Sequence, residues 1–250
     1  SKTMTAVLGR VMCGASLIGS LLKNKEDSLT LRIDGDGPAG KIICVSDYLG
    51  NVRICADHYG VELPPNASGK LDVGGAVGRG TLYVIRDLGL AEPYIGSAAL
   101  VSGEIAEDIT NYFAASEQTP TVCALGVRAD TEKRCIAAGG YLVQLLPGAD
   151  EGIVPALERN MSSMESVSKL IKDGVSGEEI VARVFDGIPF DLFDKFECGY
   201  VCSCSRERYL SALRGLPRAD IDEMKADGQP IEALCRFCGK KYSFSPDEIG

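Results

Sequence analysis

A single histidine, His58, stands among the 250 residues of the chain. A serine–histidine or cysteine–histidine catalytic pair needs an imidazole beside its nucleophile, and the sequence shows no such arrangement. His58 lies in a predicted loop over residues 56–60, where we expect a solvated side chain. The shortage of histidine therefore argues against these kinds of hydrolytic enzyme.

The sequence also lacks an apolar run long enough to span a bilayer. The most apolar N-terminal stretch, residues 6–22, carries Arg10, which does not suit a signal-peptide core. Its apolar residues fall mostly on one helical face: Val7, Leu8, Val11, Met12, Ile18, Leu21 and Leu22. We predict an amphipathic core helix and no membrane partner.

Positive charge is in deficit, with 26 Lys and Arg against 35 Asp and Glu and a formal net charge of −9. Residues 198–250 hold equal numbers of the two kinds, so residues 1–197 carry the whole excess. An acidic body is a poor electrostatic match to nucleic acid or anionic lipid. The C-terminal basic residues that could form a nucleic-acid-binding face are balanced by acids: Arg206, Arg208, Arg236, Lys240 and Lys241. No nucleic-acid partner is expected.

Residues 1–150 are predicted to form a mixed α and β core domain. Alternation and β-branched composition predict strands over residues 29–33, 41–45, 51–56, 81–86, 94–102, 121–128 and 135–146. A helix is predicted over 103–116, and the last two strands could pair with one another. Many antiparallel strands with few helices between them indicate an α+β fold with an antiparallel-rich sheet.

The stretch 74–80 is rich in glycine, as nucleotide-binding loops are. A nucleotide-binding loop should open a helix, whereas this stretch precedes a predicted strand. We interpret it as a turn that needs positive φ.

Residues 151–197 are predicted to form a helical linker. Apolar residues recur at helical spacing from Ile153 to Ile171, and Ser176 with Glu179 forms a predicted capping box that opens a second helix ending at Gly187. A phenylalanine-rich segment, 188–196, follows. Short amphipathic helices have little stability alone, so these helices need a surface to dock on.

Ten cysteines could suggest a secreted disulfide scaffold, but proteins of that class are short and carry their cysteines in loops. Five cysteines stand singly in apolar or strand-like stretches: Cys13, Cys44, Cys55, Cys123 and Cys135. We predict that these five are buried small hydrophobes of a protein in a reducing compartment, and that the protein is cytoplasmic.

The region 198–250 contains two close cysteine pairs, Cys202-Ser203-Cys204 and Cys235-Arg236-Phe237-Cys238. Two such pairs separated by a small-domain length of chain are how four thiolates converge tetrahedrally on Zn²⁺. Gly239 follows the second pair, where its freedom lets backbone N–H groups turn toward the sulfurs.

We therefore predict one zinc ion per chain, held by Cys202, Cys204, Cys235 and Cys238, rather than two unrelated pairs of buried or disulfide-bonded cysteines. Helices are predicted over 205–213 and 220–226 and a strand over 241–244. About fifty residues are too few for a robust core, so metal binding must supply much of the folding energy.

Cys198 is a fifth cysteine near this motif, four residues before Cys202. It could replace a ligand, join a disulfide or remain a spare thiol. Because four ligands are complete without it, the spare thiol is favoured.

The spacing of Cys202 and Cys204 indicates redox chemistry. A disulfide between such near neighbours would close a strained ring, and strained disulfides tend to be labile or regulatory. Zinc-bound thiolates remain nucleophilic toward peroxide or hypochlorite. Oxidation would remove the ligands and, with them, the energy that folds the region, which is the behaviour of a switch.

The alternative of an enzyme rests on Glu104, Glu107 and Asp108, which are spaced i, i+3 and i+4 in a predicted helix. One helical face could present these carboxylates for metal binding or acid–base work. The helix dipole explains acids in a first helical turn more simply, so we predict that the protein is not an enzyme and has no catalytic residue.

The runs CSCSRER at 202–208 and CRFCGKKYSF at 235–244 resemble the redox-switch motif of the redox-regulated heat-shock chaperones, also called thirty-three-kilodalton chaperonins. Stretches of the body resemble the core signatures of the same family: LGR at 8–10, GDGPAG at 35–40, LVSGEIAEDI at 100–109, YFAASEQTP at 112–120 and AAGGYLVQLLPGAD at 137–150. The resemblance covers nearly the whole chain.

This resemblance implies an ATP-independent holdase with a core domain (1–150), a helical linker (151–197) and a zinc-binding redox-switch domain (198–250). It implies that oxidation joins Cys202 to Cys204 and Cys235 to Cys238, so that zinc is released, the linker unfolds and apolar surface becomes available to unfolding client proteins. Active family members are typically homodimers, and members usually carry a further segment ahead of the LGR motif. Cys198 is not part of the family's four-cysteine motif.

Overall fold

The computed structural model describes residues 1–249 and divides the chain into two compact units, Ser1–Gly199 and Tyr200–Gly250. The first unit combines two antiparallel sheets with helices, and the second is a small module of two helices and a hairpin. No helix within residues 1–249 has the length and apolar character needed to cross a membrane.

The larger sheet has the strand order β3-β2-β1-β4-β5, with every neighbouring pair antiparallel. Its strands are β1 (Ser28–Gly35), β2 (Ile42–Asp47), β3 (Val52–Ala56), β4 (Gly80–Asp87) and β5 (Tyr94–Ala99). Along β1, Leu29, Leu31 and Ile33 are buried while the residues between them are half-buried, so one face of the sheet is turned to the core. The predicted α+β class and antiparallel-rich sheet are confirmed.

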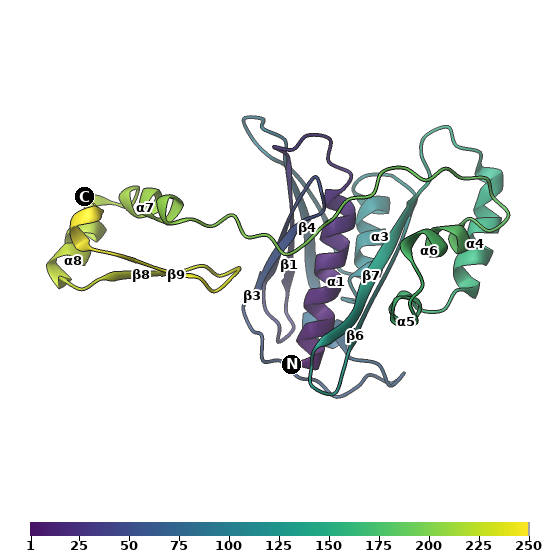
Figure 1. The fold of residues 1–250 in the computed structure, drawn as a ribbon, viewed down its shortest axis with the longest axis horizontal. Helices are drawn as coiled ribbons and strands as arrows, with labels where there is room; N and C mark the ends of the chain where they lie inside the picture. Colours follow the sequence, from purple (N-terminus) through teal and green to yellow (C-terminus); the bar gives the residue numbers. More distant parts are fainter. Residues whose placement is uncertain (250) are drawn as a thin grey trace. The chain divides into compact units, whose positions relative to one another are not determined.

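The helices α1 (Lys2–Gly19) and α3 (Ala106–Ala115) lie between this sheet and a second antiparallel pair, β6 (Thr121–Ala129) and β7 (Cys135–Gln144) (Figure 1). The buried residues of α1 join those of the large sheet in one apolar cluster. On its other side α1 approaches the hairpin so closely that a Cβ atom at Gly9 would collide with Val127. The predicted pairing of the last two strands of this unit is confirmed.

The glycine-rich stretch contains a one-turn helix that the sequence analysis missed, α2 (Val73–Val77). The side chain of Asp72 caps it by accepting the backbone N–H of Gly75 at 2.8 Å. The expected turn follows at Gly78, where φ is 76° and a Cβ atom would collide with the backbone of Gly37. Glycine is needed here because the backbone around Gly78 passes too close to the backbone of Gly37 to leave room for a side chain.

The helix predicted over 103–116 begins only at Ala106, because Asp108 folds the preceding turn against itself. Its buried carboxylate accepts the backbone N–H groups of Val101, Ser102 and Gly103 on Oδ1, at 2.8–3.2 Å, and that of Ile105 on Oδ2 at 2.9 Å. Four backbone donors of this turn are thereby satisfied.

The linker region holds η1 (Glu151–Ile153), α4 (Val154–Ser163), α5 (Val167–Lys172) and α6 (Gly177–Val184). The single helix expected from Ile153 to Ile171 is therefore two helices, broken at Met164, whose backbone is extended. The break lets α5 turn onto the β6–β7 hairpin, where Ser168 and Ile171 contact the glycine positions 126 and 139. The capping box of α6 is confirmed: Glu179 N–H donates to Ser176 Oγ at 3.2 Å, and Ser176 N–H donates to Glu179 Oε2 at 2.8 Å.

Residues 189–199 form neither helix nor strand. Their apolar side chains are exposed, and Phe193 is the extreme case at 90%. The end of the segment is held in place, because Val52 N–H donates to the carbonyl oxygen of Gly199 at 2.9 Å and Gly199 N–H donates to Asn51 Oδ1 at 3.0 Å.

The second unit contains α7 (Arg206–Arg214), α8 (Arg218–Asp227), β8 (Ile231–Leu234), β9 (Lys241–Phe244) and η2 (Pro246–Glu248). The predicted helices and the strand 241–244 are present, whereas β8 was missed. Its apolar cluster is small, with four buried side chains and eight partly buried ones packed against them; the buried ones are Ile221, Tyr242, Phe244 and Ile249. Such a core supplies little stability.

We expect Asp108→Asn to lower the free energy of unfolding by about 2 kcal/mol, because one carboxylate oxygen becomes an amide donor facing a backbone N–H. Glu107→Gln, an equally conservative change at the exposed neighbouring residue, should stay within about 0.5 kcal/mol of the parent. Urea unfolding of both variants measures the difference. Equal stability of the two variants would show that the buried carboxylate does not organise this turn.

Candidate metal centre

Four cysteines of the second unit come from two places in the chain. Cys202 and Cys204 lie immediately before α7, whose N-cap residue Ser205 accepts the N–H of Arg208 at 3.2 Å. Cys235 and Cys238 lie in the loop that joins β8 to β9. This loop is closed by backbone hydrogen bonds from Cys235 N–H to Lys240 O at 2.9 Å and from Gly239 N–H to Cys235 O at 2.8 Å.

Gly239 adopts a φ of 72°, in the left-handed region that glycine enters without strain. This conformation lets the loop fold back on its own sulfurs. The backbone N–H groups of Phe237 and Cys238 donate to the Cys235 sulfur, and that of Lys240 donates to the Cys238 sulfur. The expectation that backbone N–H groups here turn toward sulfur is confirmed.

The four sulfurs lie within 4.8 Å of one another. The Sγ atoms of Cys202 and Cys235 are 3.7 Å apart, and those of Cys204 and Cys238 are 3.4 Å apart. A tetrahedral ion with bonds of ~2.3 Å to sulfur would separate its ligands by about 3.8 Å. The donor set and its spacing therefore fit a single thiophilic metal ion. Within residues 1–249, no other group of three or more Cys, His, Asp or Glu side chains is gathered as closely.

Two tyrosines border the sulfurs. The Tyr242 hydroxyl donates to Cys204 Sγ at 3.1 Å, and the Tyr209 hydroxyl donates to the sulfur of Cys235. Their rings lie 5.1 Å apart, centre to centre, and Cys235 is only 2% exposed. The sequence analysis missed both donors. The signal for Tyr242 was its position in the predicted strand 241–244, which follows the second cysteine pair.

The electrostatics concentrate negative charge on one sulfur. Burial by itself would raise the pKa of Cys235, but the N–H groups of Cys238 and Phe237, with the Tyr209 hydroxyl and the Cys202 thiol, outweigh it and lower the pKa to about 6. Burial raises the pKa of Cys202 to about 12. Without a cation, negative charge therefore falls on Cys235 while Cys202 remains a protonated thiol, whereas a bound divalent ion would favour four thiolates.

The remaining predicted site candidates do not converge on a second site. Glu104 lies before α3 and pairs with Arg10, and Asp108 is occupied by backbone N–H groups. Glu107 and His58 are exposed, as expected for the histidine. Cys198 is not a member of the four-sulfur group. The placement of the three acids on one helical face was wrong for Glu104.

The chain thus combines an α+β unit with a following four-cysteine unit. Comparison with known proteins shows which family has this combination. The sequence model of the Hsp33 family, described as "Hsp33 protein", matches residues 1–245. The chain is 45% identical over 249 residues to the 33 kDa chaperonin of Ruminiclostridium cellulolyticum, covering 100% of this chain and 85% of the relative. It is 44% identical to the 33 kDa chaperonin of Symbiobacterium thermophilum, over 98% of this chain and 83% of that one.

The fold gives the same answer. The crystal structure of the 33 kDa chaperonin of Thermotoga maritima, a heat shock protein 33 homologue, superposes with a TM-score of 0.90 at 37% identity, over 100% of this chain and 84% of that one. The chain belongs to the Hsp33 family of chaperones.

We expect the reduced chain to bind one Co²⁺ ion, a spectroscopic substitute for zinc, with the visible absorption of a tetrahedral four-sulfur site. Cys202→Ser should weaken this binding strongly, and Cys135→Ser, a change at an exposed cysteine of the first unit, should not. Unchanged Co²⁺ binding in Cys202→Ser would contradict the site.

Metal binding should weaken as the pH falls. Each thiol must lose its proton to become a ligand, so the affinity drops about tenfold per pH unit for every proton released. Below the Cys235 pKa of about 6 even the most acidic thiol is protonated. A Co²⁺ titration repeated at several pH values measures this dependence, and a constant affinity down to about pH 5 would exclude thiolate ligands.

Proposed function

We propose that this protein is a redox-regulated, ATP-independent holdase that binds unfolding proteins after its metal-bound cysteines are oxidised. The observation that carries the proposal is the group of four sulfurs within 4.8 Å in a unit with a very small apolar core. Membership of a chaperone family supports the general activity. The regulatory mechanism is the part that needs testing.

In the reduced state, Cys202, Cys204, Cys235 and Cys238 would hold one Zn²⁺ ion. Four thiols suit a soft, tetrahedral ion, and the spacing of the sulfurs already approaches the edge of its coordination tetrahedron. The bound ion would supply the charge that keeps all four sulfurs deprotonated. It would also supply folding energy, because four buried apolar side chains cannot stabilise fifty residues alone.

Oxidation would convert the ligands into disulfides, pairing Cys202 with Cys204 and Cys235 with Cys238. In each pair, two thiolates give up two electrons to one peroxide molecule, which takes two protons from the solvent and is reduced to two molecules of water. Disulfide sulfurs no longer hold the ion, so the second unit loses the interaction that folds it.

We divide the chain functionally into a core domain (1–150), a helical linker (151–197) and the redox switch (198–250). The linker helices bury few side chains each: Leu157 in α4, Val167 and Leu170 in α5, and Ile180 and Val184 in α6. This modest burial supports a linker that undocks when the switch unfolds.

The contact between α4 and the β6–β7 hairpin is incompletely packed. A cavity of about 490 Å³ opens between them, lined by apolar side chains that include Val122, Leu157, Met161 and Phe185. A loosely filled contact costs less to separate than a close-packed one. Undocking would add these side chains to the apolar groups already exposed over 189–199.

The proposed partners are unfolding client proteins, with homodimers as the active form. We propose a cytoplasmic role in the oxidative stress response, with no enzymatic activity, nucleic-acid partner or membrane partner. The acidic net charge of −9 supports the exclusion of nucleic acid.

Treatment with peroxide at mildly raised temperature should release about one zinc ion per chain and make the protein suppress aggregation of a denatured test enzyme. Zinc release is followed with a chromogenic chelator and aggregation by light scattering. Cys235→Ser should loosen zinc and expose residues 151–197 to protease without oxidant, whereas Cys135→Ser should behave like the parent. Equal holdase activity in the zinc-bound reduced protein would refute the switch.

We expect Phe193→Ser to weaken client binding by the oxidised protein severalfold without changing thermal stability, because this side chain is 90% exposed and touches little in the folded state. Asp194→Ser, at the adjacent exposed position, is the matched control. Suppression of aggregation at limiting chaperone concentration measures the effect. Identical activity of the two variants would remove residues 189–199 from the client surface.

A further inference from the structure

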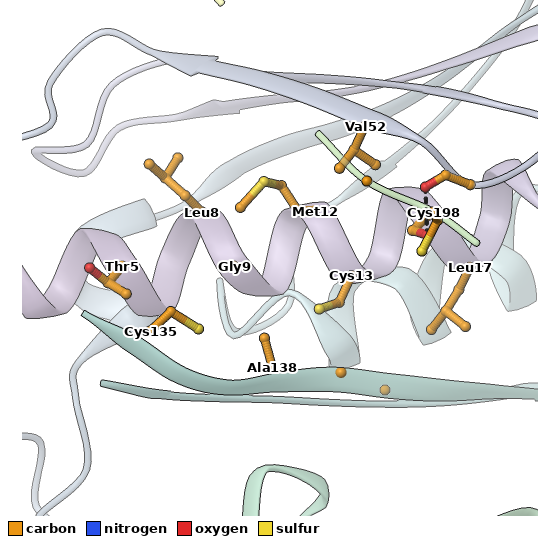
Figure 2. A pocket seen from close by; sticks show the side chains of 15 residues that line it. Thr5, Leu8, Gly9, Met12, Cys13, Leu17, Val52, Cys135, Ala138 and Cys198 are labelled. Carbon is orange, nitrogen blue, oxygen red and sulfur yellow. Dashed lines mark hydrogen bonds between the residues drawn. The ribbon is translucent and has the colours of Figure 1, made fainter. Parts of the chain in front are cut away.

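Three cysteines outside the metal centre line one apolar pocket of the first unit, with a volume of about 550 Å³. They are Cys13 on α1, Cys135 at the start of β7 and Cys198 on the extended segment that ends the linker. Figure 2 shows Cys13 between the other two, over the hairpin. The prediction that isolated cysteines are buried holds for Cys44, Cys55 and Cys123 but is wrong for Cys135, which is exposed; Cys13 is half-buried.

Cys198 is brought to the pocket by defined contacts. The backbone on its C-terminal side is tied to Asn51 and Val52 by the two hydrogen bonds of Gly199. The carbonyl oxygen of the adjacent Gly50 accepts the hydroxyl of Ser16 at 2.8 Å. Ser16 is one turn beyond Cys13 on α1, so both face the same side of the helix.

The three thiols differ in access and in backbone environment. Cys135 and Cys198 are exposed. Burial raises the pKa of Cys13 to about 11, with further contributions from Cys135 and Cys198, so Cys13 is a protonated thiol at neutral pH. Cys135 is fixed in the β-ladder opposite Ala129, whereas Cys198 lies in a segment without helix or strand.

A shared metal ion does not account for this group. Among residues 1–249, only the four cysteines of the second unit bring three or more ligand atoms within 4.8 Å of one another. A disulfide needs only two sulfurs, and Cys198 lies outside helix and strand, whereas the backbone of Cys135 is held in the β6–β7 ladder.

We propose that oxidation joins Cys198 to Cys13 in a further disulfide, which ties the chain to α1 at the residue directly after the linker. The proposal rests on the proposed function only for its oxidant, a peroxide. It assigns a role to Cys198, which would anchor the linker to the core while the metal centre is lost.

The reaction follows from the difference in access. The exposed Cys198 sulfur attacks peroxide and becomes a sulfenic acid, and the other peroxide oxygen leaves as water. The sulfur of Cys13 then attacks the sulfenic sulfur, and the displaced hydroxyl leaves as water with the Cys13 proton. Two thiols lose two electrons in total, and one peroxide is reduced to two water molecules.

The disulfide would change how the linker responds to oxidation. With residue 198 fixed on α1, the segment 189–197 becomes a loop closed at both ends by the core while the helices remain docked. The hydrogen bond from Val52 N–H to Gly199 O would persist in the oxidised protein. Hydrogen exchange at the Val52 amide should therefore stay slow in the oxidised parent and become at least tenfold faster in oxidised Cys198→Ser.

The decisive experiment is disulfide mapping of the full chain after peroxide treatment, with free thiols blocked before tryptic digestion. Cleavage after Arg10 and Lys23 places Cys13 alone in peptide 11–23. Cys198 lies in peptide 196–206 with Cys202 and Cys204, and Cys135 lies alone in 135–159. We expect peptide 11–23 joined to 196–206 in the parent and in Cys135→Ser, and no such product in Cys198→Ser.

Recovery of peptide 11–23 with a free thiol, or joined to 135–159, would overturn the proposal, as would persistence of the product in Cys198→Ser. In Cys13→Ser, a sulfenic-acid trap should label Cys198; absence of the label would overturn the order of steps. Zinc release distinguishes the redox switch from the Cys13–Cys198 disulfide. Oxidised Cys198→Ser should release zinc as the parent does, because Cys198 is not in the four-sulfur group. A chain that forms the 13–198 link but keeps its zinc would refute the redox switch and leave the tether standing.

Discussion

The smaller unit depends on the meeting of four sulfurs. Its apolar cluster has four buried side chains with eight partly buried ones around them, and its two helices bury only Ile221 between them. The loop that joins β8 to β9 can fold back because Gly239 adopts a left-handed φ. Its backbone N–H groups then point toward the sulfurs of Cys235 and Cys238. Backbone N–H groups thus stabilise negative charge on sulfur, and the four sulfurs together could hold a metal ion. The proposed redox switch rests on this arrangement, because oxidised sulfurs can no longer act as thiolate ligands.

The first unit is stabilised in a different way, by burial of apolar surface between two sheets. The helices α1 and α3 fill the space between the large sheet and the β6–β7 hairpin, and α5 covers the hairpin's other face (Figure 1). The buried carboxylate of Asp108 has all its partners within this unit. Loss of a metal centre in the second unit would therefore leave this core folded, which a chaperone needs if it is to present a surface while part of it is unfolded.

The cysteines fall into environments that separate structural from reactive roles. Burial raises the pKa of Cys44 and Cys123 well above the ordinary value, so these thiols are inert in the core. Cys13, Cys135 and Cys198 share a pocket that the exposed members open to oxidant. Under the two proposals, a single oxidant would have opposite effects at two places. It would unfold the second unit by removing its metal ligands, and it would attach the chain at Cys198 to α1.

Local patterns in the sequence were sufficient for the features that depend on near neighbours. The cysteine spacing indicated the four-sulfur group, the Ser176–Glu179 box marked the start of α6, and alternation located the strands of both sheets in the first unit. Features that depend on distant contacts could not be predicted in this way. Helix α3 starts late because Asp108 satisfies four backbone donors, and the helix from Ile153 breaks because α5 docks on the hairpin.

Tertiary structure alone also brought Cys13, Cys135 and Cys198 to one pocket. These residues are separated by 122 and 63 positions in the sequence, and their elements meet only because α1 packs on β7 while the end of the linker is hydrogen-bonded beside α1. Spacing along the sequence shows which neighbouring side chains can act together, as in the two close cysteine pairs. Which distant side chains can react with one another depends on how the core packs, and that is visible only in the fold.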